Sequence, residues 1–142
     1  MPNDETKSAI RTVIAELDEG LRKRDVASVA RHHAADAAIF DLAPPLSHRF
    51  DPAGLAAWIS TWNGPVIRDT RELGITVDGD LAVWHGFFHT SATTLDGEHR
   101  AWWERATLVF RRESQSWKVV HEHTSVPFYM DGSLRAATDL SP

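Results

Sequence analysis

The amino-acid sequence predicts an α+β fold in which helices come first and a meander of antiparallel strands follows. Apolar residues recur at helical spacing between residues 10 and 62. From residue 66 onward the pattern changes to long alternating runs, separated by the turn sequences Asp78-Gly79 and Asp96-Gly97. Helices followed by consecutive strands indicate a segregated α+β arrangement rather than alternating βα units.

Three helices and one short strand are expected in the first half. Apolar residues from Ile10 to Leu21 fall on one face of a helix, with Asn3 or Asp4 as its N-cap. Asp51 before Pro52 is a typical helix start, since Asp caps and Pro fits the first helical position. The expected elements that follow the first helix are a helix over Val26–Ala34 capped by Asp25, a strand over Asp36–Leu42, a loop over Leu46–Phe50 and a helix from Pro52 to Trp62.

Four strands are expected in the second half. They cover Val66–Val77, Asp80–Thr94, Arg100–Arg112 and Trp117–Val126. The segment from Pro127 onward has turn residues at Asp131-Gly132 and is expected to be loosely held. The sequence therefore predicts a single domain over residues 1–142, of which 129–142 form a C-terminal tail.

Composition excludes several classes of function. The net charge is −5 and the basic residues are scattered, which argues against nucleic acid or an anionic membrane as partner. The chain has no cysteine, so disulfides, thiolate metal sites and cysteine nucleophiles are excluded. No apolar run approaches membrane-spanning length, and the first residues lack the pattern of a signal peptide. A cytoplasmic location is expected.

Strand alternation sorts the side chains of the expected sheet onto two faces. The even-numbered positions form the more apolar face, which we expect to meet the helices. Glu104 and Glu122 interrupt this face, and burial of a carboxylate requires a partner or a function. The inward positions are Ala82, Trp84, Gly86, Phe88, Trp102, Glu104, Ala106, Leu108, Phe110, Val120, Glu122 and Thr124.

The odd-numbered face carries His121, His123 and Ser125 on the last strand. We interpret these residues as hydrogen-bonding groups of an outer face that also serves as a homodimer interface. An alternative is a metal site at His121 and His123, because histidines two apart on a strand lie on the same side.

Four segments of the sequence resemble the SnoaL-like branch of the NTF2-like superfamily, which includes ketosteroid isomerase homologues. These segments are Phe40–Leu46, Asp78–Ala82, Trp103–Thr107 and His121–Phe128. The resemblance extends over the chain to about Phe128. It implies a cone in which three N-terminal helices pack in a strongly curved antiparallel sheet.

The resemblance also implies roles for individual residues. Asp41 falls at the position of the general base, and Glu104 at that of a protonated acid that binds an enolate oxygen. Leu17 occupies the position of a second oxygen-binding group, a tyrosine, whereas the only tyrosine of this chain is Tyr129. Glu122 is the second inward carboxylate and joins Asp41 and Glu104 as a candidate catalytic residue.

These observations predict a small-molecule acid–base enzyme that works without a cofactor. The expected reaction is an isomerisation, a cyclisation of the polyketide cyclase type or a dehydration of a small hydrophobic carbonyl compound. Core packing explains the aromatic residues equally well. The expected substrate contacts are Leu17, Trp58, Trp62, Trp84, Phe88, Leu108, Val120 and Thr124.

Two other functions remain open from the sequence. The first is a non-catalytic ligand-binding or assembly module, in which arginines would neutralise Glu104 and Glu122 and no pocket would reach Asp41. The second is the metal site based on His121 and His123.

Overall fold

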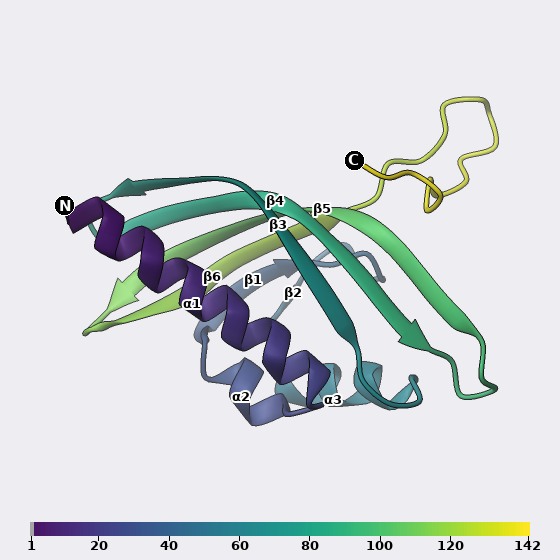
Figure 1. The fold of residues 1–142 in the computed structure, drawn as a ribbon, viewed down its shortest axis with the longest axis horizontal. Helices are drawn as coiled ribbons and strands as arrows, with labels where there is room; N and C mark the ends of the chain where they lie inside the picture. Colours follow the sequence, from purple (N-terminus) through teal and green to yellow (C-terminus); the bar gives the residue numbers. More distant parts are fainter. Residues whose placement is uncertain (1) are drawn as a thin grey trace.

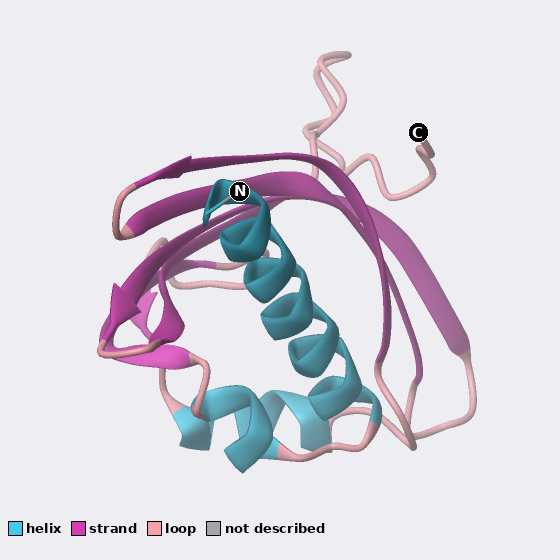
Figure 2. Ribbon diagram, turned by 60° about the vertical axis from the view of Figure 1, so that its left-hand side comes forward, coloured by secondary structure: helices cyan, strands magenta, loops and turns pink. Residues whose placement is uncertain are grey.

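A strongly curved six-stranded sheet wraps around one long helix, as Figures 1 and 2 show. The computed structural model describes residues 2–142. The strand order across the sheet is β2-β1-β6-β5-β4-β3. The elements are α1 (Pro2–Arg22), α2 (Val26–Ala30), β1 (His33–Phe40), β2 (His48–Arg49), α3 (Pro52–Ser60), β3 (Ile67–Asp78), β4 (Leu81–Thr93), β5 (His99–Glu113) and β6 (Ser116–Ser125).

The sheet combines an antiparallel meander with one parallel pair. Strands β3 to β6 pair in sequence order, as expected, but β1 pairs with β6 in the parallel direction. The expectation of a purely antiparallel sheet is therefore wrong at this edge. Only α1 and α2 precede the first strand, because α3 follows β1 and β2. The expected loop over Leu46–Phe50 contains β2, which pairs with β1 through Ile39 and His48.

The long helix α1 fills the concave face of the sheet (Figure 2). Its apolar stripe of Ile10, Ile14 and Leu17 is buried and packs in one cluster with residues of β4, β5 and β6. The periodicity of the sequence located this stripe, although the helix begins earlier, at Pro2. The sheet residues of the cluster include Trp84, Phe88, Leu108, Phe110 and Val119.

The expected caps of α2 and α3 are formed, whereas Asn3 and Asp4, the expected caps of the first helix, lie within α1. Helix α2 is shorter than the sequence suggested. The Asp25 side chain accepts a hydrogen bond from the backbone N–H of Ser28, and that of Asp51 accepts one from Ala53, each at 3.1 Å. Helix α2 ends at Ala30 and β1 begins at His33, within the predicted helix. Pairing with β6 explains the difference, because the backbone N–H of Val119 donates to the carbonyl of His32 at 2.8 Å.

Strand alternation holds in β4 and β5 and fails in one part of β6. The even residues of β4 and most of those of β5 are buried. The register between β5 and β6 shifts between Val109 and Phe110, so Val120 is an extra residue in the ladder. Val119 is fully buried as a result and Val120 is half-buried, the reverse of the expectation.

The segment after β6 extends away from the sheet (Figures 1 and 2). Backbone hydrogen bonds from Tyr129 to Arg135 and from Ala137 to Pro127 close it into a loop. Its apolar side chains Met130 and Leu134 are exposed. Within residues 2–142, no helix is long and apolar enough to cross a membrane.

Candidate active site

A cavity of about 610 Å³ lies between the concave face of the sheet, the helices and the loop that follows β1. This volume is typical of small-molecule sites. Leu17, Leu55, Trp58, Val66 and Trp102 contribute to its apolar wall. The titratable residues that line it are His33, Asp41, His48, Arg49, Asp51, Arg68, Glu104 and Glu122.

The cavity brings together all three carboxylates expected to be catalytic, Asp41, Glu104 and Glu122. Of the expected substrate contacts, Leu17, Trp58 and Thr124 line it. Trp84, Phe88 and Leu108 also point inward but pack in the core against α1. The two remaining expected contacts, Trp62 and Val120, are not among the residues that line the cavity.

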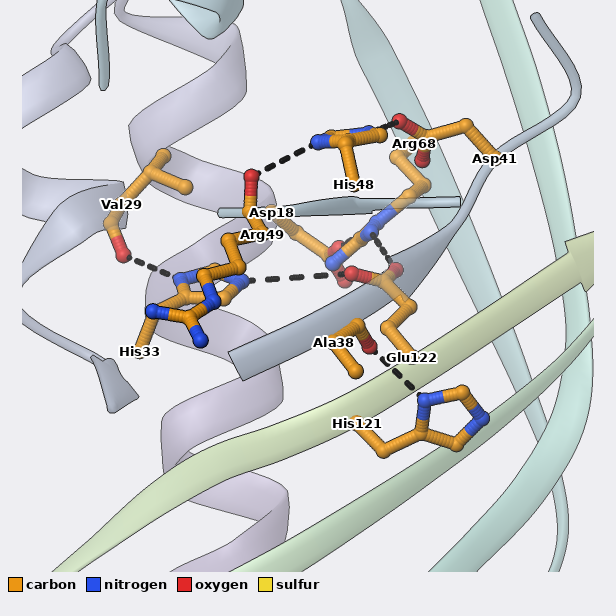
Figure 3. A network of polar contacts seen from close by, with 10 residues as sticks. All are labelled: Asp18, Val29, His33, Ala38, Asp41, His48, Arg49, Arg68, His121 and Glu122. Atoms are coloured by element: carbon orange, nitrogen blue, oxygen red, sulfur yellow. Dashed lines mark hydrogen bonds and ion pairs between the residues drawn. The ribbon is translucent and has the colours of Figure 1, made fainter. Parts of the chain in front are cut away.

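The two histidines of the alternative metal site lie outside the cavity, beside Phe40. His121 donates a hydrogen bond through Nδ1 to the carbonyl of Ala38 at 2.7 Å, so it joins β6 to β1 (Figure 3). Within residues 2–142 the structure has no group of three or more side chains placed to hold a metal ion.

Glu104 is a buried acid in the cavity wall. Its side chain comes from the inward face of β5, and the hydroxyl of Thr90 on β4 donates to its Oε1 at 2.8 Å. Burial raises the pKa of the Glu104 carboxyl above its ordinary value, and the charge of Glu122 adds to this effect. Glu104 therefore remains protonated to higher pH than an exposed glutamate, and its O–H can donate to a ligand oxygen.

Glu104 should make the protein less stable as pH rises. The protonated carboxyl is favoured in the folded state, so stability falls as pH rises from the unfolded value of 4.5 through the higher folded value. We expect Glu104→Gln to flatten this decline, because glutamine keeps the acceptor for Thr90 and does not ionise. Urea unfolding of both proteins across this pH range measures the effect. Parallel curves for the two proteins would contradict the assignment.

Glu122 lies between two basic side chains, as Figure 3 shows. Its Oε2 is 3.9 Å from Nε2 of His33, and its Oε1 is 3.8 Å from Nη1 of Arg68. Burial alone would raise the pKa of Glu122, but His33 and the charge on Arg68 outweigh it and lower this pKa. The pKa values of two carboxyl groups in the same cavity, Glu104 and Glu122, are thus shifted in opposite directions.

Arg68 is held in place by a buried ion pair with α1. Its Nε donates to Oδ1 of Asp18 at 2.5 Å, and its guanidinium lies over the ring of Phe88, 3.9 Å from the ring centroid. The nearby carboxylates keep the pKa of Arg68 raised although its burial opposes this. Asp18 therefore anchors the cation that faces Glu122.

Asp41 lies at the opening of the cavity and is 44 % exposed. Nε2 of His48 donates to Oδ2 of Asp41 at 2.6 Å, and Nδ1 of His48 donates to the carbonyl of Arg49 at 2.8 Å. The hydrogen bond to Asp41 raises the pKa of His48. The pair of His48 and Asp41 thus lies at the opening, placed by the short pairing of β1 with β2.

Sequence reasoning missed His33 and His48 as cavity residues. His33 fell in a segment predicted to be helical, and His48 in a segment predicted to be a loop. The hydrophobic pattern contained no signal for either position, because both depend on strand pairing with distant parts of the chain.

The chain matches the family model described as a SnoaL-like domain over residues 10–129. Among solved structures, an NTF2-like protein of unknown function from Pseudomonas putida KT2440 is similar, with 28 % identity, 98 % coverage of both chains and a TM-score of 0.84. No curated protein sequence matches the chain.

Two further structures are similar in fold. A putative dehydratase from the NTF2-like family of Streptomyces avermitilis is 16 % identical, with a TM-score of 0.78 over 89 % of this chain and 99 % of that one. A hexachlorocyclohexane dehydrochlorinase is 14 % identical, with a TM-score of 0.74 over 99 % of this chain and 95 % of that one.

Proposed function

The chain belongs to the family of SnoaL-like domains, and from this premise we propose that it is an acid–base enzyme acting on a small hydrophobic carbonyl compound without a cofactor. One observation carries the proposal. The same cavity holds a buried acid with a raised pKa, Glu104, and a carboxylate at its opening, Asp41. Two carboxyl groups in such different surroundings are suited to the roles of acid and base.

In the proposed reaction the carbonyl oxygen of the substrate accepts a hydrogen bond from Glu104. Asp41 removes a proton from the carbon next to the carbonyl, and the negative charge that develops on the oxygen is stabilised by the Glu104 O–H. The apolar wall, including Trp58 and Val66, excludes water and strengthens this interaction. Return of the proton to another carbon completes an isomerisation.

Cyclisation and dehydration begin with the same proton removal, so the three reactions share the proposed groups. Two proteins of similar fold are described as a putative dehydratase and a dehydrochlorinase, names that denote eliminations. This likeness supports proton-abstraction chemistry as a class, and the choice among the three reactions depends on the substrate.

A non-catalytic module is the competing function, and two features favour the enzyme over it. A module of this kind requires a pocket that stops short of Asp41, whereas the cavity reaches Asp41. It also requires both inward glutamates to be neutralised by arginines. Arg68 contacts Glu122, but Glu104 is hydrogen-bonded by the neutral hydroxyl of Thr90.

Exchange of a ketone proton for deuterium tests the proposal without knowledge of the natural substrate. Benzylacetone, a small hydrophobic ketone, is incubated with the protein in D₂O, and deuterium next to the carbonyl is measured by NMR. We expect the protein to accelerate exchange. Glu104→Gln should slow it about tenfold, because an amide N–H is a weaker donor than a carboxylic acid. Exchange at the buffer rate with a panel of aryl ketones would overturn the proposal.

A further inference from the structure

We propose that Glu122 and His33 form a subsite for a hydrogen-bond donor of the substrate, either a hydroxyl or a protonated amine. The inference deepens the proposed function by naming a substrate class, and it rests on that function only in treating the cavity as the substrate site. The substrate would then be a hydrophobic carbonyl compound with a donor group some distance from the carbonyl.

The first argument is that the polar contacts of Glu122 are long. Its nearest basic neighbours, His33 and Arg68, are 3.9 Å and 3.8 Å away, beyond the usual hydrogen-bond range. The two ion pairs that hold this carboxylate are therefore long. A carboxylate that is 16 % exposed and held by contacts of this length is costly to bury. Glu122 lines the cavity, so a ligand in the cavity can supply a closer donor.

The second argument is that His33 presents a fixed nitrogen to the same space. Its Nδ1 is 3.0 Å from the carbonyl of Val29, which can only accept, so Nδ1 carries a hydrogen. The ring is 4 % exposed and stacks on Phe50, with the centroids 3.8 Å apart and the planes 11° from parallel. In the neutral ring Nε2 is therefore an acceptor that faces Glu122 (Figure 3).

When His33 is neutral, its Nε2 and the Glu122 carboxylate are two acceptors that face each other, and a ligand donor between them is favourable. A protonated amine donates to both Nε2 of His33 and the Glu122 carboxylate. A hydroxyl donates to one acceptor, and its oxygen accepts from Nε2 when His33 is protonated. A ligand donor therefore satisfies both groups, and an apolar group at the same place satisfies neither.

The local charge argues against an anionic group at this position. Asp18 already forms the close ion pair with Arg68. Asp18 and Glu122 together carry one negative charge more than Arg68, so an anion placed against Glu122 is repelled, although Arg49 also lines the cavity. The same charge favours a neutral donor or a cation.

Binding of a matched series of flat ligands tests the inference. Isothermal titration calorimetry compares β-naphthol and naphthylmethylamine, which carry donors, with β-methoxynaphthalene, which has none, and with naphthoic acid, which is anionic. We expect at least one donor ligand to bind about tenfold more tightly than the methoxy compound, which corresponds to one net hydrogen bond. Naphthoic acid should bind most weakly. The amine–naphthol comparison identifies the kind of donor.

Two variants test whether Glu122 and His33 cause the preference for donor ligands. In Glu122→Gln and in His33→Phe, which keeps an aromatic ring against Phe50, we expect the preference for donors to fall below about threefold. Equal binding of naphthol, the amine and the methoxy compound to the unmodified protein would overturn the subsite. A preference that survives both substitutions would also overturn it.

The binding test of the subsite and the exchange test of the proposed function can fail independently of each other. Benzylacetone has no donor group, so its deuterium exchange reports on Asp41 and Glu104 and not on the subsite. Donor preference without exchange contradicts the enzyme and supports the subsite. Exchange without donor preference contradicts the subsite and supports the enzyme.

Discussion

Replacement of Arg68 by methionine is expected to lower the free energy of unfolding by about 3–5 kcal/mol. The substitution removes the ion-pair partner of Asp18 at 2.5 Å and the cation that faces Glu122. It leaves Asp18 with the hydrogen bond from Thr70 and Glu122 with the long contact to His33. It also removes the guanidinium that lies over Phe88. A loss of this size is a large fraction of the stability of an ordinary domain.

The matched control is Arg11→Met, because Arg11 also joins α1 to β3. Its guanidinium bonds Glu72 at 2.9 Å, but the two side chains are 55 % and 29 % exposed. Exposed pairs contribute little, so the expected loss is much smaller than that for Arg68→Met. Urea unfolding followed by tryptophan fluorescence gives both values. Equal losses would show that burial of the Arg68 pair does not determine its contribution.

The destabilisation by Arg68→Met should also shrink in acid. Since the pKa of Glu122 is lowered in the folded protein, its stabilising contribution is present above the unfolded value of 4.5 and is lost as pH falls through the folded value. In the variant Arg68 no longer lowers the pKa of Glu122, so protonation of Glu122 removes its charge as the pH falls and the two proteins converge.

Replacement of Asp41 by asparagine is expected to slow deuterium exchange into benzylacetone by about 10²–10⁴-fold. Asparagine has nearly the size of aspartate and still offers an oxygen to His48, which bonds the aspartate at 2.6 Å. The amide does not take up a proton at neutral pH, so the proposed base is lost while the opening of the cavity keeps its shape. The exchange rate measured by NMR at saturating ketone gives the effect.

Asp36→Asn is the control for this experiment. Asp36 is in β1, 69 % exposed, and contacts Arg111 at 3.7 Å rather than lining the cavity. Its substitution should leave exchange within about twofold of the unmodified rate, as expected for a surface position. An Asp41→Asn protein that exchanges as fast as Asp36→Asn would remove Asp41 from the mechanism.

Strand alternation explains why two of the three cavity carboxylates were accessible to sequence reasoning. Glu104 and Glu122 interrupt apolar faces, and an anomaly in a strict two-residue period is visible without a structure. Asp41 was found differently, through the resemblance of its segment to a family. The predicted β3 to β6 meander also follows from local signals, because each turn between these strands is short.

The same alternation gives the face of a residue but not its position along the cone. Trp84 and Phe88 point inward as predicted, yet they pack beneath α1, away from the cavity. Val120 illustrates a second limit. A one-residue bulge buries Val119 in place of Val120, and no local signal in the sequence marks the bulge.

Pairing between strands that are far apart in the chain explains the remaining differences between the predicted and the observed elements. The segment from Val26 to Ala34 has helical character. Its last residues, including His33, nevertheless pair with β6 and belong to the sheet. The two-residue strand β2 exists only because β1 lies beside it. Both features place histidines in the cavity, so the candidate site is less predictable than the fold.

The parallel pairing of β1 with β6 has a consequence for the order of folding. His121 and Ala38 share a hydrogen bond although they are 83 residues apart in the chain. Closing so long a loop is slow compared with forming the hairpins of the meander. We therefore expect the β1–β6 seam to form late, after the β3 to β6 meander has assembled. Until then β6 is an open edge exposed to other chains, and Asp41 and Glu122 belong to separate parts of the molecule.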